Sequence, residues 1–435
     1  MKTKATFLAL IPIIFFSVSG GPYGLEEIVS SVGPINTLFL VLLLPLFWTI
    51  PECLVVAELS STYPVQGGYY RWVQMGLGRF WGFMEGWWSI LYTLVDMSLY
   101  PILFTTYLKL LFPNLGFLGV YLIQLSMIWS CALINILGIR LVGNVLTLFK
   151  IIILISFVIF VVLGMNYISF DFTPIFKSAH KFQVNNLLFG LSLAFWNYIG
   201  WDNASTILGE VDEPQINYHK AVFITIPIIV LIYFFPLLTG LSICTDWQNW
   251  KFGEFSFIAN SMNHPLLAMV LTIGGMVMCL GLFNSLLLTS TRVISTMAED
   301  KLFPLSFVKI HKKFNTPYYA IIFSAFVYSV LILVDFKNLV IYDVFLYLIA
   351  LLLEAFALVS LRKINPHLNS CFKIPFGKLG LYSVVGIISF VIFLMVLINI
   401  LNFNNACNGS LVAFFLVISG VPVYFLCEKL LKTAD

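Results

Sequence analysis

The sequence predicts an all-α integral membrane protein, and composition, segment length and hydropathy pattern all support this fold class. Of the 435 residues, 60% are hydrophobic and only 10% are charged, and the mean hydropathy is +0.99. Such a chain has too little polar surface to cover a soluble globule of its size. Its long segments are apolar on all sides, as in spanning helices, whereas the strands of a membrane β-barrel would alternate apolar and polar residues.

Twelve segments are long and apolar enough to be candidate spanning helices. Short connections separate them, without a linker or low-complexity tract, so we expect one membrane domain over residues 1–435. The candidates are residues 6–32, 36–59, 80–112, 116–138, 141–164, 186–209, 219–243, 265–298, 318–334, 338–361, 379–402 and 409–431.

The first segment is interrupted near residue 20. Ser19-Gly20-Gly21-Pro22-Tyr23-Gly24 is followed at once by two glutamates, at positions 26 and 27. Such a break leaves backbone N–H and C=O groups that lipid cannot satisfy, so it survives only where it lines a cavity or is covered by protein. The half-helix after the break should present unpaired N–H groups to an anion such as a carboxylate. We therefore predict that Ser19, Gly20, Gly21, Tyr23 and Gly24 bind a solute.

The sixth segment has a similar interruption. Residues 194–206 contain Asn197, Tyr198, Gly200 and Asp202 at the middle of an apolar stretch. Carbonyl oxygens at the end of the preceding half-helix, from Trp196 onward, would favour an ammonium group. The two breaks lie five segments apart, so the second copy would enter the membrane from the opposite side. This spacing predicts an inverted-topology repeat.

The distribution of lysine and arginine predicts the orientation. If the N-terminus is cytoplasmic, most of the 23 basic residues fall on the cytoplasmic side, and only Lys109, Lys177, Lys181, Lys251 and Lys337 fall outside. We therefore expect both termini to be cytoplasmic. The first residues also fit a cleavable secretory signal, although the apolar sequence continues beyond the cleavage point that this would use.

Catalytic and metal chemistry have little support. The seven cysteines show no CxxC or Cys/His spacing, and the five histidines fall in predicted loops. No glycine-rich phosphate loop is followed by Lys-Ser/Thr. We expect no enzyme activity, cofactor or metal, and no binding of nucleic acid, because the net charge of +3 is explained by the orientation bias.

Motifs spread over most of the chain point to a known family. They include the break itself and short polar or glycine-containing stretches in the same order as in the family: residues 19–27, 50–52, 57–59, 67–70, 81–86, 96–101, 201–211, 297–304 and 315–317. In these residues the chain resembles the amino acid/polyamine/organocation (APC) transporter superfamily, and most of all its polyamine-uptake and L-type amino acid permease branch.

The resemblance implies a twelve-helix LeuT-like fold. Residues 1–164 would form the first five-helix repeat, residues 186–362 the second, inverted repeat, and residues 379–431 two additional helices. Helices 1 and 6 would be discontinuous, as the two interruptions predict.

The resemblance also assigns roles to single residues. Trp196 matches an aromatic position that closes over the substrate in relatives. Lys150 matches the lysine that stands where sodium binds in sodium-coupled relatives, and Asp202 matches an acidic position linked to protonation. We therefore expect Lys150 and Asp202 to couple transport to protons. From the sequence alone, Lys150 could instead extend to the inner membrane surface.

The predicted spans hold more carboxyl groups than a carrier of neutral solutes needs: Glu26, Glu27, Glu52, Glu85, Asp96, Asp202, Asp343 and Glu354. Each ammonium group removed from water needs such a partner, and we expect Asp96 to contact the substrate. Glu27, Glu85 and Asp343 are expected near an interface, in contact with water. Glu58 and Glu210 are expected to pair with arginines such as Arg71 or Arg292.

Together these features predict a proton-coupled, alternating-access transporter in the plasma (inner) membrane that takes up a cationic amine or amino acid. Its partners would be a small amino acid or polyamine, the proton and the lipid bilayer, and it would be a monomer or homodimer. The alternatives are a neutral amino acid permease or exchanger, a sodium-coupled carrier, or a transporter-like amino acid sensor.

Overall fold

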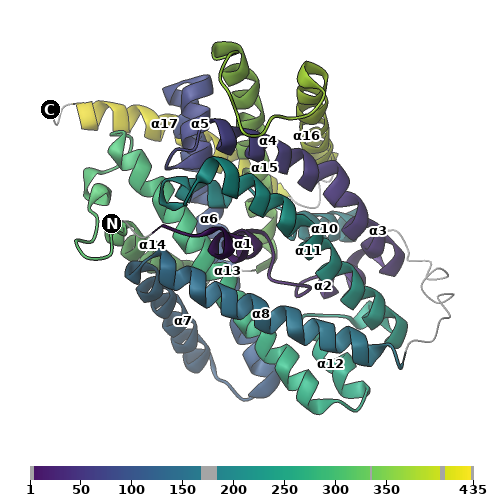
Figure 1. The fold of residues 1–435 in the computed structure, drawn as a ribbon. Helices are drawn as coiled ribbons and strands as arrows, with labels where there is room; N and C mark the ends of the chain where they lie inside the picture. Colours follow the sequence, from purple (N-terminus) through teal and green to yellow (C-terminus); the bar gives the residue numbers. More distant parts are fainter. Residues whose placement is uncertain (1–3, 168–183, 334–335, 402–406, 433–435) are drawn as a thin grey trace.

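The computed structural model describes residues 4–167, 184–333, 336–401 and 407–432, and these residues form a bundle of α-helices (Figure 1). The extended pairing found among them is one isolated bridge between Ala5 and Val211. Within the described residues, eight helices are long and apolar enough to cross a membrane. The fold is therefore that of a multi-pass membrane protein, and the count of twelve spans and the inverted repeat stay predictions from the sequence.

Most helices begin and end close to the predicted segments, whereas two short helices, at Gly68–Leu77 and Glu254–Ser261, lie between them. The helices are α1 (Phe7–Val18), α2 (Glu26–Val32), α3 (Pro34–Leu44), α4 (Ile50–Thr62), α5 (Gly68–Leu77), α6 (Arg79–Leu111), α7 (Phe117–Leu137), α8 (Ile139–Gly164), α10 (Val184–Trp196), α11 (Pro214–Ile243), α12 (Glu254–Ser261), α13 (Pro265–Glu299), α14 (Tyr318–Leu331), α15 (Phe336–Ile364), α16 (Gly377–Leu401) and α17 (Cys407–Lys432). A π-helical turn, η1 (Pro45–Thr49), joins α3 to α4, so this predicted span is continuous.

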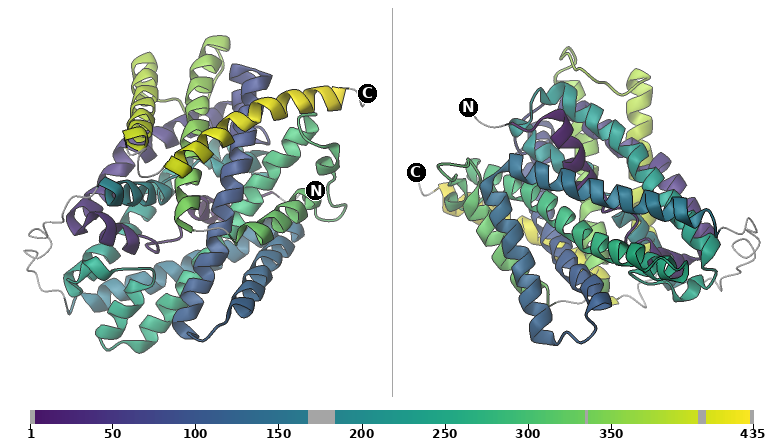
Figure 2. Two further views of the ribbon diagram at one scale, coloured as in Figure 1. Left: turned by 180° about the vertical axis from the view of Figure 1, so that it is seen from behind. Right: turned by 60° about the horizontal axis from the view of Figure 1, so that its bottom comes forward.

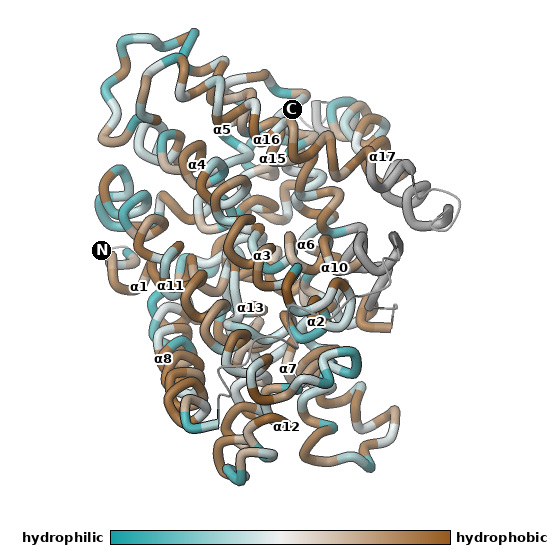
Figure 3. Tube along the Cα trace, turned by 90° about the vertical axis from the view of Figure 1, so that its right-hand side faces the viewer, coloured by the Kyte–Doolittle hydropathy of each residue, from teal (hydrophilic) through white to brown (hydrophobic). Residues whose placement is uncertain are grey.

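Helix α6 packs along both α13 and α15 at the centre of the bundle. Peripheral helices such as α7 and α14 lie side by side at one edge (Figure 2). They expose large apolar side chains, among them Leu122, Leu133 and Phe326. Figure 3 shows apolar residues along the helix bodies and polar ones gathered in the connections at either end. This distribution suits a surface that faces lipid in its middle and water at its ends.

The first predicted interruption is present. Helix α1 ends at Val18 and α2 begins at Glu26, and between them the backbone is not helical. Gly21 and Gly24 have φ angles of 91° and 93°, a left-handed conformation that an L side chain rarely adopts. The two glycines therefore allow the chain to turn between the two half-helices.

The second predicted interruption is also present, and it lies against the first. Helix α10 ends at Trp196, and a 3₁₀ helix, η2 (Asn203–Glu210), replaces the rest of the predicted span. Gly200 has a φ of 100°, and a Cβ atom there would overlap the backbone carbonyl of Ser17 at the end of α1. Only glycine fits here, because the two broken backbones touch at this point.

At one end of the molecule, elements far apart in the chain are tied together around Glu210. Its backbone carbonyl accepts a hydrogen bond from the N–H of Ala5 at 2.7 Å. Its carboxylate accepts one from Arg292 Nε at 2.9 Å. The predicted pairing of Glu210 with Arg292 is thus confirmed.

Glu58 has a different partner from the two that the sequence suggested. Its carboxylate pairs with Arg362 at the end of α15, and it also accepts the N–H of Ile374. Arg71, on α5, pairs with Asp300 at 2.6 Å instead. The expectation that Arg71 or Arg292 would pair with Glu58 is wrong, because α15 packs against α4 and brings Arg362, which is 304 positions further along the chain, next to Glu58.

Candidate functional site

A small internal cavity lies where the two broken helices meet. Its volume is about 20 Å³, roughly the room that a single water molecule needs. Residues from α1, α6, the α10 break, α13 and α15 enclose it: Ser17, Val18, Tyr92, Asp96, Tyr100, Trp196, Ile199, Gly200, Asn203, Leu286, Asp343 and Tyr347. A solute larger than a water molecule would therefore need the walls to move apart.

Polar side chains reach this region because they recur at helical spacing on two long helices. On α6, Glu85, Ser89, Tyr92, Asp96 and Tyr100 follow one another at intervals of three or four residues and are all buried. Such intervals place side chains on one face of a helix. This face of α6 packs towards α15, so the two helices enclose a polar interior inside an apolar bundle.

Asp96 is held by two aromatic donors. Both carboxylate oxygens lie 2.8 Å from the hydroxyl of Tyr100, and Oδ1 also accepts a hydrogen bond from Trp196 Nε1 at 2.9 Å. The rings of Tyr100 and Trp196 are stacked, with centroids 6.1 Å apart. Asp343 lines the same cavity, and its Oδ1 atom has no hydrogen-bond partner in the part of the chain that the structure describes. The arrangement offers two carboxyl groups beside two aromatic faces.

A second group of carboxyl side chains lies behind the α10 break. The hydroxyl of Tyr347 contacts Glu52 Oε1 and Asp202 Oδ1, each at 2.5 Å, and accepts the N–H of Gly200 at 2.9 Å. Glu354 also lies within electrostatic range of Asp202.

Glu85, on the polar face of α6, also lies close enough to Asp202 for the two carboxyl groups to interact electrostatically. Both oxygens of Glu85 and of Glu354 are buried and have no hydrogen-bond partner among the described residues. The expectation that Glu85 and Asp343 contact water is wrong, because both side chains are almost completely buried, with relative exposures of 0% and 1%.

At the first break, the chain itself satisfies part of the backbone. Gly24 N–H donates to Glu26 Oε2 at 2.7 Å, and Gly21 N–H donates to Ser19 Oγ at 3.0 Å. The expectation that these two N–H groups are free is therefore wrong. A carboxylate already occupies the positive end of α2, which is where a carboxylate-bearing solute would otherwise bind.

Of the residues predicted to bind substrate, Asp96, Trp196 and Gly200 line the cavity, whereas the other predicted residues lie around it. Tyr23 turns away and donates to the carbonyl of Leu271 at 2.7 Å. Tyr198 donates to the carbonyl of Val41, also at 2.7 Å. The remaining residues outside the lining are Ser19, Gly20, Gly21, Gly24 and Asn197, which shape or cap the two breaks.

Sequence reasoning missed several wall residues, among them Tyr92, Tyr100, Asn203 and Tyr347. The helical spacing of polar residues in α6 could have identified the two tyrosines of that helix. Tyr347 stands four residues after Asp343, so the two share a face of α15 by the same rule.

The two residues predicted to couple protons, Lys150 and Asp202, lie in different parts of the structure. Asp202 belongs to the carboxyl group around Tyr347. Lys150 is half-buried on α8, one turn from Ile153, whose side chain packs against Gly21 of the first break. No hydrogen bond or ion pair links Lys150 to another described residue.

The fold and the site define a class of protein: a multi-pass membrane protein whose two interrupted helices enclose a buried, carboxyl-lined cavity. The chain belongs to the amino acid permease family, because the model of that family matches residues 10–422. Such membership indicates transport.

Named relatives agree with this assignment. The chain is 33% identical to the polyamine transporter RMV1 of Arabidopsis thaliana over 386 residues, 87% of this chain and 77% of the relative. It is 32% identical to the polyamine transporter PUT1 of Oryza sativa subsp. japonica over 87% of this chain and 72% of the relative. It is also 25% identical to the serine/threonine exchanger SteT of Bacillus subtilis, over 88% and 86%.

Proposed function

We propose that the protein is a secondary active transporter that takes up a polyamine or a similar small amine by alternating access, coupled to protons. The observation that carries the proposal is the pair of carboxyl groups in the cavity lining. Asp96 and Asp343 line it, and no ion pair found among the described residues includes either of them. A solute that brings ammonium groups would supply the missing positive charge.

The aromatic walls support an amine substrate as well. An ammonium group over an indole or phenol ring gains about 0.5 to 2 kcal/mol, and more when the site excludes water. Trp196 and Tyr100 are both buried and stacked beside Asp96. In our proposal Trp196 closes over the bound amine, and Asn197, Tyr198 and Gly200 provide the backbone around its other end.

A substrate without a carboxylate is favoured over an amino acid by the first break. In our proposal Glu26 fills the anion site that Ser19, Gly20, Gly21, Tyr23 and Gly24 surround, so an amino acid would have to bring a second carboxylate next to the first. Like charges at this distance repel. The relatives named as polyamine transporters agree with this preference.

An amino acid permease or exchanger is the second candidate, supported by the similarity to the serine/threonine exchanger. Its substrate would have to displace the Glu26 carboxylate from the N–H of Gly24, and this requirement distinguishes the two candidates.

Proton coupling is supported by a count of hydrogens at Tyr347. Its hydroxyl carries one hydrogen and can donate it to only one of the two carboxyl groups, Glu52 and Asp202, that lie 2.5 Å away. The other contact is a hydrogen bond only if that carboxyl group carries a proton and donates it to Oη. We propose that Asp202 exchanges this proton during the cycle, with Lys150 taking the place of a sodium ion near the first break.

We further propose the LeuT-like arrangement of two inverted repeats, residues 1–164 and 186–362, followed by residues 379–431. Two breaks five segments apart that meet at one point support it. The basic residues favour an orientation with both termini in the cytoplasm. We also propose that the protein lies in the plasma (inner) membrane as a monomer or homodimer.

The test is uptake by purified protein in liposomes. Labelled putrescine, spermidine, arginine, ornithine and leucine are offered with and without imposed pH and sodium gradients. We expect accumulation of a polyamine that depends on the pH gradient and does not depend on sodium. Accumulation of leucine alone, or a requirement for sodium, would contradict the proposal.

A further inference from the structure

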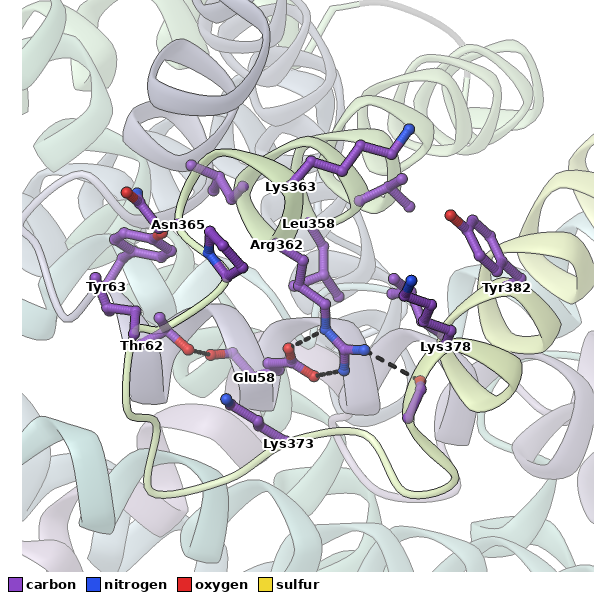
Figure 4. A pocket seen from close by; sticks show the side chains of 16 residues that line it. Glu58, Thr62, Tyr63, Leu358, Arg362, Lys363, Asn365, Lys373, Lys378 and Tyr382 are labelled. Carbon is purple, nitrogen blue, oxygen red and sulfur yellow. Dashed lines mark hydrogen bonds and ion pairs between the residues drawn. The ribbon is translucent and has the colours of Figure 1, made fainter.

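A second cavity, of about 290 Å³, lies at the end of the molecule where α15 finishes and α16 begins. Figure 4 shows Lys363, Lys373 and Lys378 around the paired side chains of Glu58 and Arg362. The transport cycle proposed above uses none of the three lysines. The cavity therefore needs a separate explanation.

The cavity is positively charged, and its three lysines form no ion pair with the described residues. Arg362 is committed to Glu58, with its Nη1 also donating to the carbonyl of Gly377 at 3.1 Å, so these two residues neutralise each other. Lys363, Lys373 and Lys378 form no hydrogen bond or ion pair with any described residue. Three positive charges therefore surround one hollow, and none of them is paired with an anion among the described residues.

The wall next to the lysines is apolar and continues along α16. Leu381 and Tyr382 line the cavity, and Tyr382 is 52% exposed. Leu379 and Phe390, on the same helix, are 75% and 59% exposed, and the intervals between these residues keep them on one side of α16. An exposed apolar stripe on a long apolar helix faces the lipid chains of a membrane.

We propose that this cavity binds the phosphate-containing headgroup of an anionic phospholipid, with its acyl chains lying along the exposed face of α16. Basic cavities at the ends of membrane helices bind such headgroups because each nearby lysine is attracted to the anionic lipid. A free phosphate shares the chemistry of the headgroup, but it would make no use of the apolar stripe. The lipid therefore explains both the charge and the exposed side chains.

The position of the cavity indicates what the lipid would touch. Glu58 belongs to α4, whereas Arg362 ends α15 and Ile374 precedes α16, and Glu58 is hydrogen-bonded to both. The headgroup would thus lie on a contact between three separate parts of the chain. It would stabilise this contact without taking part in substrate binding.

The experiment compares lipid binding by two double variants of the full chain, using native mass spectrometry and thermal unfolding in detergent with added phosphatidylglycerol or phosphatidylcholine. The first variant, Lys373→Gln with Lys378→Gln, removes two charges from the cavity and leaves the Glu58–Arg362 pair intact. The matched control, Lys309→Gln with Lys312→Gln, removes two charges from exposed lysines outside the cavity.

We expect the unaltered protein and the control to retain phosphatidylglycerol and to unfold at a higher temperature with it than with phosphatidylcholine. The cavity variant should bind phosphatidylglycerol about 25-fold more weakly, roughly fivefold for each lysine. Equal binding by the two variants, or equal retention of phosphatidylcholine, would overturn the proposal. Displacement of the lipid by inorganic phosphate at the same concentration would assign the cavity to a soluble anion and overturn the lipid assignment.

Discussion

The carboxyl group of Glu26 accepts a hydrogen bond from the backbone N–H of Gly24 at 2.7 Å, so the positive end of α2 is capped by a carboxyl group that belongs to the protein. The Glu26 side chain is fully buried, and no described residue forms a hydrogen bond with its other oxygen. This relationship bears directly on the choice between amines and amino acids.

Neutralising Glu26 should weaken the discrimination against carboxylates. Putrescine and ornithine differ only in a carboxylate group, so the ratio of their uptake measures this discrimination. In Glu26→Gln we expect the preference for putrescine over ornithine to fall about tenfold, because the repulsion between two carboxylates is removed. Glu27→Gln, the neighbouring half-buried position, is the control and should leave the ratio unchanged. An unchanged ratio in Glu26→Gln would show that Glu26 only caps the helix.

Removing the charge of Asp96 should weaken substrate binding more than transport itself. A hydrogen bond to a charged group contributes about 1.5 to 3 kcal/mol, so Asp96→Asn should raise the KM for putrescine about 10- to 100-fold. Initial uptake rates over a range of concentrations measure this effect. Asp246→Asn, at an exposed position away from the cavity, is the control. A normal KM in Asp96→Asn would remove Asp96 from the substrate site.

Neutralising Asp202 should separate exchange from accumulation. Without a carboxyl group that gains and loses a proton, Asp202→Asn can no longer bind the proton differently in the outward-open and inward-open states. We expect it to lose accumulation driven by a pH gradient while it still exchanges internal for external substrate. Both modes can be followed in the same liposomes. Full gradient-driven uptake by this variant would remove Asp202 from the coupling role.

Breaking the Glu58–Arg362 pair should destabilise the protein through the charge that is left behind. The Glu58 side chain is only 3% exposed, and Arg362→Gln leaves its carboxylate without the arginine, at a cost of about 3 kcal/mol. We expect a lower unfolding temperature for Arg362→Gln. The double variant Glu58→Gln with Arg362→Gln should recover most of the loss, because no unpaired charge remains. A double variant less stable than the single one would point to a role beyond charge pairing.

Adding a methyl group at Gly200 should separate the two breaks. Its Cβ would overlap the carbonyl of Ser17, and alanine also disfavours a φ of 100°. We expect Gly200→Ala to lose nearly all uptake and to unfold at a lower temperature. Gly386→Ala on α16, where a Cβ would meet no other atom within 4 Å, is the control. Normal uptake by Gly200→Ala would show that the contact between the breaks is dispensable.

Much of the fold could be predicted because hydropathy and helix-breaking residues act locally. The apolar segments and the interruptions at Gly21 and Gly200 follow from the order of residues alone, and the helices begin and end within a few residues of the expected positions. The partners of buried charges could not be predicted in this way. Several arginines were available to Glu58, and only the packing of α15 against α4 selects Arg362.

The residues of the candidate site could likewise be predicted only in part from the sequence. Asp96, Trp196 and Gly200 were identified because each is unusual within its own segment, as a charge, an aromatic beside a break or a glycine in an apolar run. Asp343 and Tyr347 join them only because α15 packs along α6, and hydropathy contains no information about that neighbour.

The sequence by itself thus determined that this is a membrane protein with two broken helices. Tertiary structure alone decided which acids share the cavity and which N–H groups Glu26 and Ser19 already occupy, because hydrogen bonds and charge pairs act over a few ångströms between residues that may be hundreds of positions apart.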